Sequence, residues 1–569
     1  MSSSSSSAAI QRKRVKVKAK AVASDDGSGL GATTAAAMVI GFATSSIMMS
    51  TIMQVGPTYL EPVYGNVLAH QWFTSGIVIS MAVGAALGSR LWRGLTTGPT
   101  AGSPKADART ERLIGAALDV AALLTALAPW RTALLFQESR WLGPVWGPVV
   151  THVSLAAPVA AASGFIAAVS VARLLHGRRT AWIAAYVGAA VATMWAGRGA
   201  AGVHSGCQGL LLVAGYAALS SVMIKLLGRR RRLLLLVAPT IAAVVFGVLT
   251  LGSDPRCASG LTARNNVGSA YHMLSRAESV TGWVTVSDEA ERRLRLLRSG
   301  HSIIGGHWNE TQESIFGIFY YADAVRLVSS RRSRRRTNER ALIIGLGIGV
   351  AARSLHEQDV KVDVVELDPA VYRAAVDFFR LPRNLHGVYL QDGRRFIDDA
   401  ADGSYDYIVH DVFTGGSVPA VLFSQSAVAQ LSRILAPRGV LAMNYVGMLS
   451  DTRTLYHVAH TLRSAFAHVR CFAESIEDPT GVTNMMFFAS QKPIAFAPGA
   501  LRNSSNPDTI RARVLADMED NEVSIVYDEQ SVRLITDAWN PLPKWLAPAA
   551  QVHWHAMRDM FPDEYWLNY

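Results

Sequence analysis

Cysteine is scarce in this chain of 569 residues. The three cysteines are Cys207, Cys257 and Cys471, and their spacing fits neither a disulfide framework nor a metal site. We therefore expect ordinary, unreactive thiols and no bound metal ion.

Charged residues are also scarce. They make up 17% of the chain, against about a quarter in soluble globular proteins, while 50% of the residues are hydrophobic. The formal charge is +12, but residues 341–497 carry 13 Lys and Arg against 16 Asp and Glu, a charge of −3. A nucleic-acid-binding domain would present a basic face, so this composition argues against nucleic acid as a partner. The apolar excess instead indicates membrane-spanning segments in part of the chain.

Long apolar runs recur through the first half of the chain. Each approaches the roughly 20 residues that a helix needs to cross a bilayer, and several are rich in Ala and Gly, which favour close helix packing in lipid. We therefore expect residues 34–253 to form a multi-pass α-helical domain with about seven spans in a lipid bilayer. The runs are Ala36–Met53, Phe73–Leu91, Leu113–Pro129, Val145–Ala172, Trp182–Ala196, Gly209–Leu226 and Leu233–Leu251.

The flanking charges suggest an orientation. Residues 1–33 are too polar to fold and are expected to form a disordered basic tail. Basic clusters alternate with less basic loops, a pattern that places the N-terminus in the cytoplasm. Seven spans would put the C-terminal half on the other side, and one span more or fewer reverses this, so the sequence leaves the side open. Sequons at Asn309 and Asn503 would permit a lumenal placement.

The pattern changes again after the apolar runs. Residues 254–340 predict a small β-rich subdomain and linker, with short strands at Glu278–Val286 and Leu294–Ile304. From Ala341 to residue 497, strands and helices alternate, which is typical of a doubly wound parallel sheet. Residues 498–569 are expected to form a C-terminal cap.

The first chemical motif follows the first strand of this α/β region. Gly345, Gly347 and Gly349 form a glycine turn that lets the backbone approach a ligand without a Cβ clash. Glu366 ends the next strand, where a carboxylate can accept both ribose hydroxyls of a nucleoside. Because the glycines lack the full dinucleotide spacing, a nucleoside-sulfonium ligand is favoured over NAD.

Two further acidic positions follow later strands. Asp392 and Gly393 come after the third strand and would reach the adenine edge, although Asp-Gly is also an ordinary turn. Asp411 comes at the carboxyl end of the fourth strand, where open α/β sheets bind ligands, and it could hold and deprotonate an amine nucleophile. A helix N-cap is the structural alternative for Asp411. His410 is expected to face away, since neighbouring strand residues alternate faces.

Together these segments resemble the spermidine synthase family, the polyamine aminopropyltransferases. The segments are GLGIGV, VELDPAV, QDGRRF, YDYIVHD, and ESVTGWVTV with RLLRSGH. The resemblance covers about residues 278–495, and the whole chain is similar to membrane-fused members of the group. It implies a Rossmann-like, class I S-adenosylmethionine-dependent transferase fold. It also implies Asp411 as the catalytic aspartate, Glu366 on ribose and Asp392 on adenine.

The chain departs from the family pattern around the acceptor. Ile348 stands where the family has an Asp that contacts the aminopropyl amine, Thr414 stands near the place of a second Asp, and Thr281-Gly282 replaces a Tyr-Gln pair. Removing carboxylates weakens the attraction for a polycation. The residues expected to bind the nucleoside therefore look intact, whereas those expected to bind the polyamine look rebuilt.

These residues support three hypotheses. The first is aminopropyl transfer from decarboxylated S-adenosylmethionine to a small-molecule amine, as in polyamine biosynthesis. The second is methyl transfer from intact S-adenosylmethionine. The third is a transporter or sensor with a degenerate nucleoside-binding domain, for which Asp119 would be the clearest intramembrane acid. The acceptor and the oligomeric state, a homodimer included, stay open.

Overall fold

The computed structural model describes residues 32–71, 73–96, 104–176, 206–227, 270–328, 338–413, 416–496 and 506–567. The chain divides into two compact units. The helical unit comprises Met1–Gly56, Phe73–Leu134 and Val150–Cys257. The C-terminal unit comprises Pro57–Trp72, Leu135–Val149 and Ala258–Tyr569, so it includes short pieces of the apolar half of the chain.

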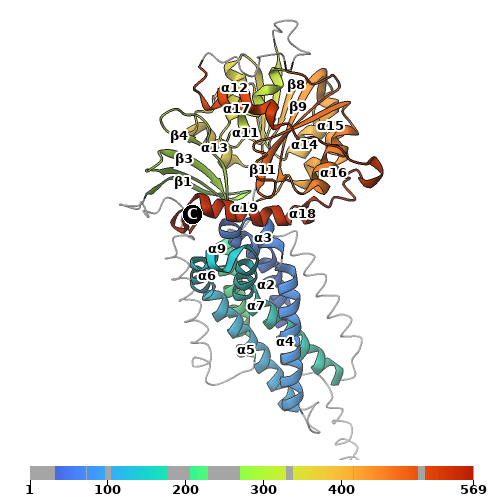
Figure 1. Ribbon diagram of the computed structural model, residues 1–569. Coiled ribbons are helices and arrows are strands. Elements are labelled where there is room, and N and C mark those ends of the chain that lie inside the picture. Colours follow the sequence, from blue (N-terminus) through green and yellow to red (C-terminus); the bar gives the residue numbers. More distant parts are fainter. Residues whose placement is uncertain are drawn as a thin grey trace, which may run out of the picture. The chain divides into compact units, whose positions relative to one another are not determined.

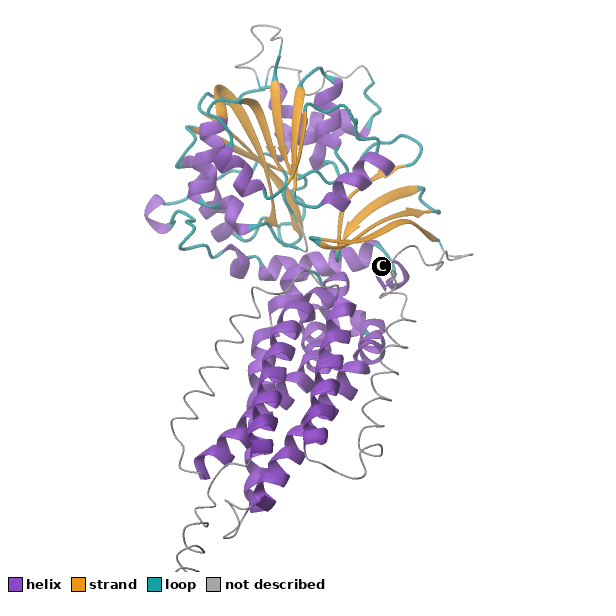
Figure 2. Cartoon of the chain, turned by 180° about the vertical axis from the view of Figure 1, so that it is seen from behind, coloured by secondary structure: helices purple, strands orange, loops and turns teal. Residues whose placement is uncertain are grey.

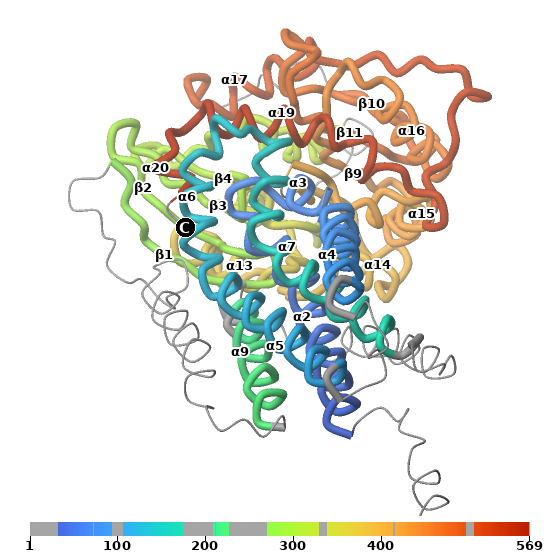
Figure 3. The backbone as a smooth tube through the Cα atoms, turned by 90° about the horizontal axis from the view of Figure 1, so that it is seen from below, coloured from blue at the N-terminus to red at the C-terminus, as the bar shows by residue number. Residues whose placement is uncertain are grey.

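Apolar helices make up the described part of the helical unit, where α2, α4, α5, α7 and α9 run side by side (Figures 1 and 3). Three helical segments are long and apolar enough to cross a membrane, namely Ala32–Tyr64, Asn66–Arg93 and Ser139–Arg173. A fourth results if α5 and α6, bent by 45°, count as one span. The bounds are α2 Ala32–Tyr64, α3 Asn66–Gln71, α4 Phe73–Thr96, α5 Pro104–Ala126, α6 Ala128–Gln137, α7 Ser139–His176 and α9 Gly206–Leu227.

Compared with the expected spans, these helices account for five of the seven apolar runs. The run Gly209–Leu226 falls within α9, which is shorter in its apolar part than the three long segments. The predicted spans Trp182–Ala196 and Leu233–Leu251 lie outside the described residues.

Small residues and ion pairs, such as Arg173 with Asp107 at 2.7 Å, hold the helical unit together. A Cβ on Gly84 of α4 would lie 1.9 Å from the carbonyl oxygen of Ala161 in α7, so the two backbones touch. Between α5 and α9, Asp119 accepts hydrogen bonds from Lys225 at 2.7 Å and from Ser221 at 2.6 Å. Asp119 therefore serves helix pairing, and this contact gives the transporter hypothesis no support.

The small sheet of the C-terminal unit consists of two hairpins rather than two strands. Each predicted strand crosses a turn, because Gly282 and Gly300 adopt φ of +93° and +53°, which reverse the chain. All four strands pair antiparallel in the order β1-β2-β3-β4. Their bounds are β1 Tyr271–Ser279, β2 Gly282–Glu289, β3 Leu294–Ser299 and β4 Ser302–Trp308.

The large sheet has seven strands in the order β10-β11-β9-β8-β5-β6-β7, with helices on both faces (Figure 2). Buried apolar side chains cover both faces and form two core clusters. The strands are β5 Arg340–Ile344, β6 Lys361–Glu366, β7 Gly387–Leu390, β8 Tyr405–His410, β9 Leu435–Met448, β10 His468–Ala473 and β11 Val482–Ser490. The helices between them are α12 Val350–Glu357, α13 Pro369–Phe378, α14 Gly393–Asp399, α15 Gln425–Ile434 and α16 Thr452–Arg463.

The expectation of a wholly parallel sheet is wrong. Strands β5 to β9 pair in parallel, but β11 runs antiparallel to both β9 and β10. A parallel pair needs a crossover connection, whereas the short segment between β10 and β11 permits only a hairpin. The fold is therefore Rossmann-like with a mixed sheet.

The last segment of the chain packs against the ends of the apolar helices within the C-terminal unit. Trp554 Nε1 donates to the carbonyl of Val63 at 2.9 Å, and Arg558 donates to Ser139 Oγ at 3.1 Å. Arg298 of β3 is 1% exposed and donates to the carbonyl of Pro62 at 2.7 Å. The helices here are α17 Ile510–Asp517, α18 Leu542–Trp545, α19 Ala547–Met560 and α20 Asp563–Leu567.

Replacing Arg298 should destabilise the C-terminal unit. Its guanidinium also donates to the carbonyls of Gly300, Tyr565 and Trp566, and a buried carbonyl without a donor costs about 1–3 kcal/mol. Arg298→Met should lower the thermal midpoint of the detergent-solubilised chain by roughly 6–12 °C, equivalent to about 3 kcal/mol. Arg383→Met, at a side chain 77% exposed, should change it little. Equal midpoints for the two variants would contradict this.

Candidate active site at the carboxyl edge of the large sheet

The glycine turn lies directly after β5 and is crowded on all sides. Gly345, Gly347 and Gly349 have φ of +82°, +52° and +82°, a region that favours glycine. A Cβ on Gly345 would lie 2.1 Å from the carbonyl oxygen of Asp411, and one on Gly347 would lie 2.9 Å from that of Ile304. The turn can therefore exist only with glycine at these positions.

Glu366, the last residue of β6, braces the turn. Its Oε2 accepts from the backbone N–H of Leu346 at 2.9 Å, and its Oε1 accepts from that of Asp368 at 2.8 Å. Burial raises the pKa of the Glu366 carboxyl, and these backbone hydrogen bonds oppose that rise. Two fixed donors orient the carboxylate while each oxygen keeps a further lone pair for a ribose hydroxyl.

Asp392 is a helix cap rather than part of the ordinary turn that its sequence also allowed. Its side chain accepts from the backbone N–H of Arg395 at 3.0 Å and so caps α14. Asp392 and Gly393 also line the cavity beside the glycine turn. The cap therefore holds Asp392 at the wall of the cavity, and its contact with adenine stays a prediction.

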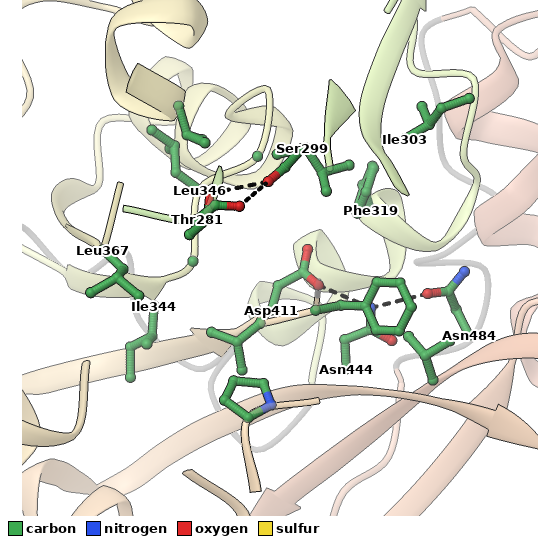
Figure 4. A pocket seen from close by; sticks show the side chains of 18 of the residues that line it. Thr281, Ser299, Ile303, Phe319, Ile344, Leu346, Leu367, Asp411, Asn444 and Asn484 are labelled. Carbon is green, nitrogen blue, oxygen red and sulfur yellow. Dashed lines mark hydrogen bonds between the residues drawn. The ribbon is translucent and has the colours of Figure 1, made fainter. Parts of the chain in front are cut away.

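Asp411 follows β8 and faces the cavity from the neighbouring strand (Figure 4). Its Oδ1 accepts from Asn444 Nδ2 at 2.9 Å. Burial raises the pKa of the Asp411 carboxyl to about 6, and the hydrogen bond from Asn444 opposes the rise. His410 packs against Phe423 with 5.2 Å between ring centroids and does not line the cavity, in agreement with its predicted orientation.

One cavity of about 370 Å³ brings these residues together. It is lined by six of the seven predicted site residues, while Gly349 shapes the turn from outside the lining. The six are Gly345, Gly347, Glu366, Asp392, Gly393 and Asp411.

Sequence reasoning missed several residues of the cavity wall. Asn444 is a polar residue inside the apolar strand β9, a signal that could have been noticed. Glu474 and Asn484 come from the β10–β11 hairpin, and His553, Met557 and Met560 come from α19, which is distant in sequence. Tertiary packing alone brings these residues to the site.

The electrostatics of the cavity favour a cationic ligand. Its lining includes the carboxylates Glu366, Asp392, Asp411 and Glu474, and no Lys or Arg occurs among the described lining residues. Burial lowers the pKa of His553 to about 4, so this imidazole is neutral near pH 7. A negative, partly buried cavity attracts cations such as a sulfonium.

Apart from these polar groups, much of the cavity lining is apolar. Ile348 does not line the cavity: its side chain packs against Gly305 of β4, where an added Cβ would lie 2.7 Å from Ile348 Cγ2. Thr281 donates to Asp368 at 2.6 Å and lies 3.0 Å from Ser299 Oγ. Thr414 lies outside the described residues. The apolar lining residues include Ile303, Ile304, Phe316, Phe319, Val446, Val482, Met557 and Met560.

Comparison with known proteins identifies the class to which this fold and site belong. Residues 325–497 match the spermine/spermidine synthase domain. A polyamine aminopropyltransferase of Vibrio vulnificus is 30% identical over 210 residues, which cover 36% of this chain and 68% of that protein. The chain belongs to the spermidine synthase family.

A second relative is named for a different activity. An N-terminal histidine N-methyltransferase of Emericella nidulans is 31% identical over 338 residues, which cover 54% of this chain and 60% of that protein. Among solved structures, a probable spermidine synthase from Corynebacterium glutamicum aligns with 18% identity and a TM-score of 0.36, covering 42% of this chain and 85% of that one. Human methyltransferase-like protein 13 in complex with SAH aligns with 21% identity and a TM-score of 0.26, covering 37% and 92%. The family assignment depends on the sequence relatives.

Asp411→Asn should stabilise the folded chain above pH 6. A carboxyl whose pKa is raised on folding stabilises the fold at low pH, and this contribution is lost as the pH rises through about 6. At pH 8 the variant should gain about 1–2 kcal/mol, less than the full linkage value because the side chain is only partly buried.

Thermal midpoints in detergent, measured near pH 4 and pH 8, check this expectation. The gain should be present at the higher pH and small at the lower pH. Asp402→Asn, at a side chain 78% exposed, is the matched control and should show no such difference. A gain that is the same at both pH values would show that charge is not its cause.

Proposed function

We propose that this chain is a membrane-anchored, S-adenosylmethionine-dependent methyltransferase whose acceptor is a nitrogen of an N-terminal histidine of a polypeptide. One observation carries the proposal: Ile348 stands where the resemblance to the aminopropyltransferases would place an Asp for the aminopropyl amine, and its side chain packs against Gly305 instead of lining the cavity. The Emericella nidulans relative, which is named for this activity, supports the acceptor class.

The described residues fit the nucleoside part of S-adenosylmethionine. Gly345 and Gly347 line the cavity with backbone of positive φ, so the turn borders the cavity without side chains. Glu366 is placed to accept the ribose hydroxyls, and Asp392 with Gly393 to border the base. When bound, S-adenosylmethionine supplies an electrophilic methyl carbon, whose bond to sulfur breaks as the nitrogen lone pair forms the new N–C bond.

Asp411 is the residue that we expect to act on the acceptor. With a pKa of about 6, its carboxylate is largely ionised near pH 7, and it can accept a hydrogen bond from the N–H of an imidazole, orient the ring and take up its proton. Asn444 holds the carboxylate in place. The apolar wall limits the access of water, which strengthens the interaction between the carboxylate and the acceptor.

Aminopropyl transfer to an amine is the second candidate. Membership of the spermidine synthase family and the similarity to the Vibrio vulnificus aminopropyltransferase favour it. The nucleoside half of the cavity would serve both reactions, since decarboxylated S-adenosylmethionine carries the same adenosine and sulfonium.

Membrane anchoring is also part of the proposal. It is supported by the three helical segments, or four with the bent pair, that are long and apolar enough to cross a bilayer. The close backbone contact of Gly84 with Ala161 is typical of helices packed in lipid.

A donor-choice experiment tests the proposed reaction. The detergent-solubilised full chain is incubated with a peptide that begins with histidine and S-adenosylmethionine, and separately with putrescine and decarboxylated S-adenosylmethionine. We expect mass spectrometry to find the peptide heavier by one methyl group. Formation of spermidine with no methylated peptide would instead establish aminopropyl transfer.

The proposed role of Asp411 predicts a pH profile. Methyl transfer by the wild-type chain should increase as the pH rises through about 6 and level off above it, because the ionised carboxylate is the active form. Asp411→Asn should lower kcat by about 10²–10⁴-fold and remove the dependence near pH 6. Asp402→Asn should keep the wild-type profile, and a full-strength profile in Asp411→Asn would exclude the role.

A further inference from the structure

Four polar side chains form a row along one side of the cavity, from Asp411 through Asn444 and Asn484 to Glu474 (Figure 4 labels the first three). They come from β8, β9, β11 and the end of β10, which are consecutive in the sheet. Asn444 Nδ2 donates to Asp411 Oδ1 at 2.9 Å and lies 3.2 Å from Asn484 Oδ1. Asn484 Nδ2 donates to Glu474 Oε2 at 2.7 Å.

The two amides point their donors at the two carboxylates. This leaves Asn444 Oδ1 as a buried acceptor without a hydrogen-bond partner among the described residues, on a side chain that is only 3% exposed. Glu474 is fixed from a second side, because its Oε1 accepts from the backbone N–H of Ile318 at 3.1 Å. A buried acceptor without a donor is costly unless a ligand satisfies it, so the row is suited to a ligand that carries N–H groups.

The length of the row limits the size of that ligand. The three hydrogen bonds and one amide group separate the end carboxylates by at most about 11 Å. A hydrogen bond of about 2.8 Å at each end leaves at most about 5 Å between two ligand nitrogens, a span that the α-nitrogen and the imidazole of one histidine residue can meet.

We propose that Glu474 binds the α-ammonium group of the polypeptide N-terminus while Asp411 holds the reacting imidazole. This inference rests on the proposed function and adds the requirement for a free α-amino group. Histidines inside a chain, or behind a blocked N-terminus, would lack the cation that Glu474 binds. Selectivity for the terminal residue then comes from one half-buried, charge-assisted contact.

The test compares two peptides and two variants in the full chain. The peptides share a sequence that begins with histidine, and one has its α-amino group acetylated. For the free peptide, Glu474→Gln should lower kcat/KM by about 10–100-fold, mainly through KM, as expected for losing a hydrogen-bonded charge. For the acetylated peptide, the variant should match the wild-type chain within about twofold, so the preference for a free N-terminus disappears.

Glu477→Gln provides the matched control, since this glutamate lies in the same hairpin but is exposed. It should keep the wild-type preference for the free peptide. Calorimetric titration with S-adenosylhomocysteine should give similar affinity in all three proteins, which would show that Glu474→Gln still folds its nucleoside site.

Three results would overturn the inference, each in a distinguishable way. Equal losses for both peptides in Glu474→Gln would mean that Glu474 only positions the wall of the cavity. A wild-type chain that methylates neither peptide would overturn the proposed function, and the inference with it. A wild-type chain that instead aminopropylates putrescine, with a raised KM for putrescine in Glu474→Gln, would show that a diamine is the occupant.

Discussion

The close passage of the glycine turn behind Asp411 is the constraint on which the site depends. β5 and β8 are neighbours in the sheet, and the backbone of Gly345 approaches the Asp411 carbonyl so tightly that no side chain fits between them. The glycine turn and the Asp411 carboxylate, to which we assign the nucleoside and the acceptor, are therefore fixed to each other through the backbone. Glu366 extends this rigidity to the next strand by accepting from the N–H of Leu346.

The distribution of charge separates the two halves of the cavity. Its carboxylates lie along the carboxyl ends of the strands, whereas the small sheet and α19 contribute mainly apolar side chains. A long polycation would need carboxylates spaced along its length, but the acceptor side offers two, joined by neutral amides. This arrangement suits a compact acceptor with two nitrogens. We infer that a change of the acceptor residues alone could adapt the family fold to a different reaction, with the nucleoside-binding residues unchanged.

The sequence predicted those features that depend on local chemistry. The glycine turn at Gly345 and Gly347 and the strand-end positions of Glu366 and Asp411 follow from residue type and strand period, whereas the helix cap formed by Asp392 was not predicted. The antiparallel β11 was missed because an apolar strand has the same pattern in either direction. Glu474 and His553 were missed because nothing local distinguishes a pocket glutamate or histidine from a surface one. Only strand order and the docking of α19 bring them to the cavity.

The two-sided role of α19 has a consequence for how the molecule can be divided. Met557 and Met560 of this helix line the cavity. Trp554 and Arg558 of the same helix donate hydrogen bonds to Val63 and Ser139 at the ends of apolar helices. A fragment that begins after residue 257 would keep every strand that the structure describes. It would lose Val63 and Ser139, to which α19 is hydrogen-bonded. It would also uncover the Trp554 ring, which stacks on Tyr64 at 6.5 Å. In a fragment of that kind, the part of the cavity wall that α19 provides would differ from that of the full chain.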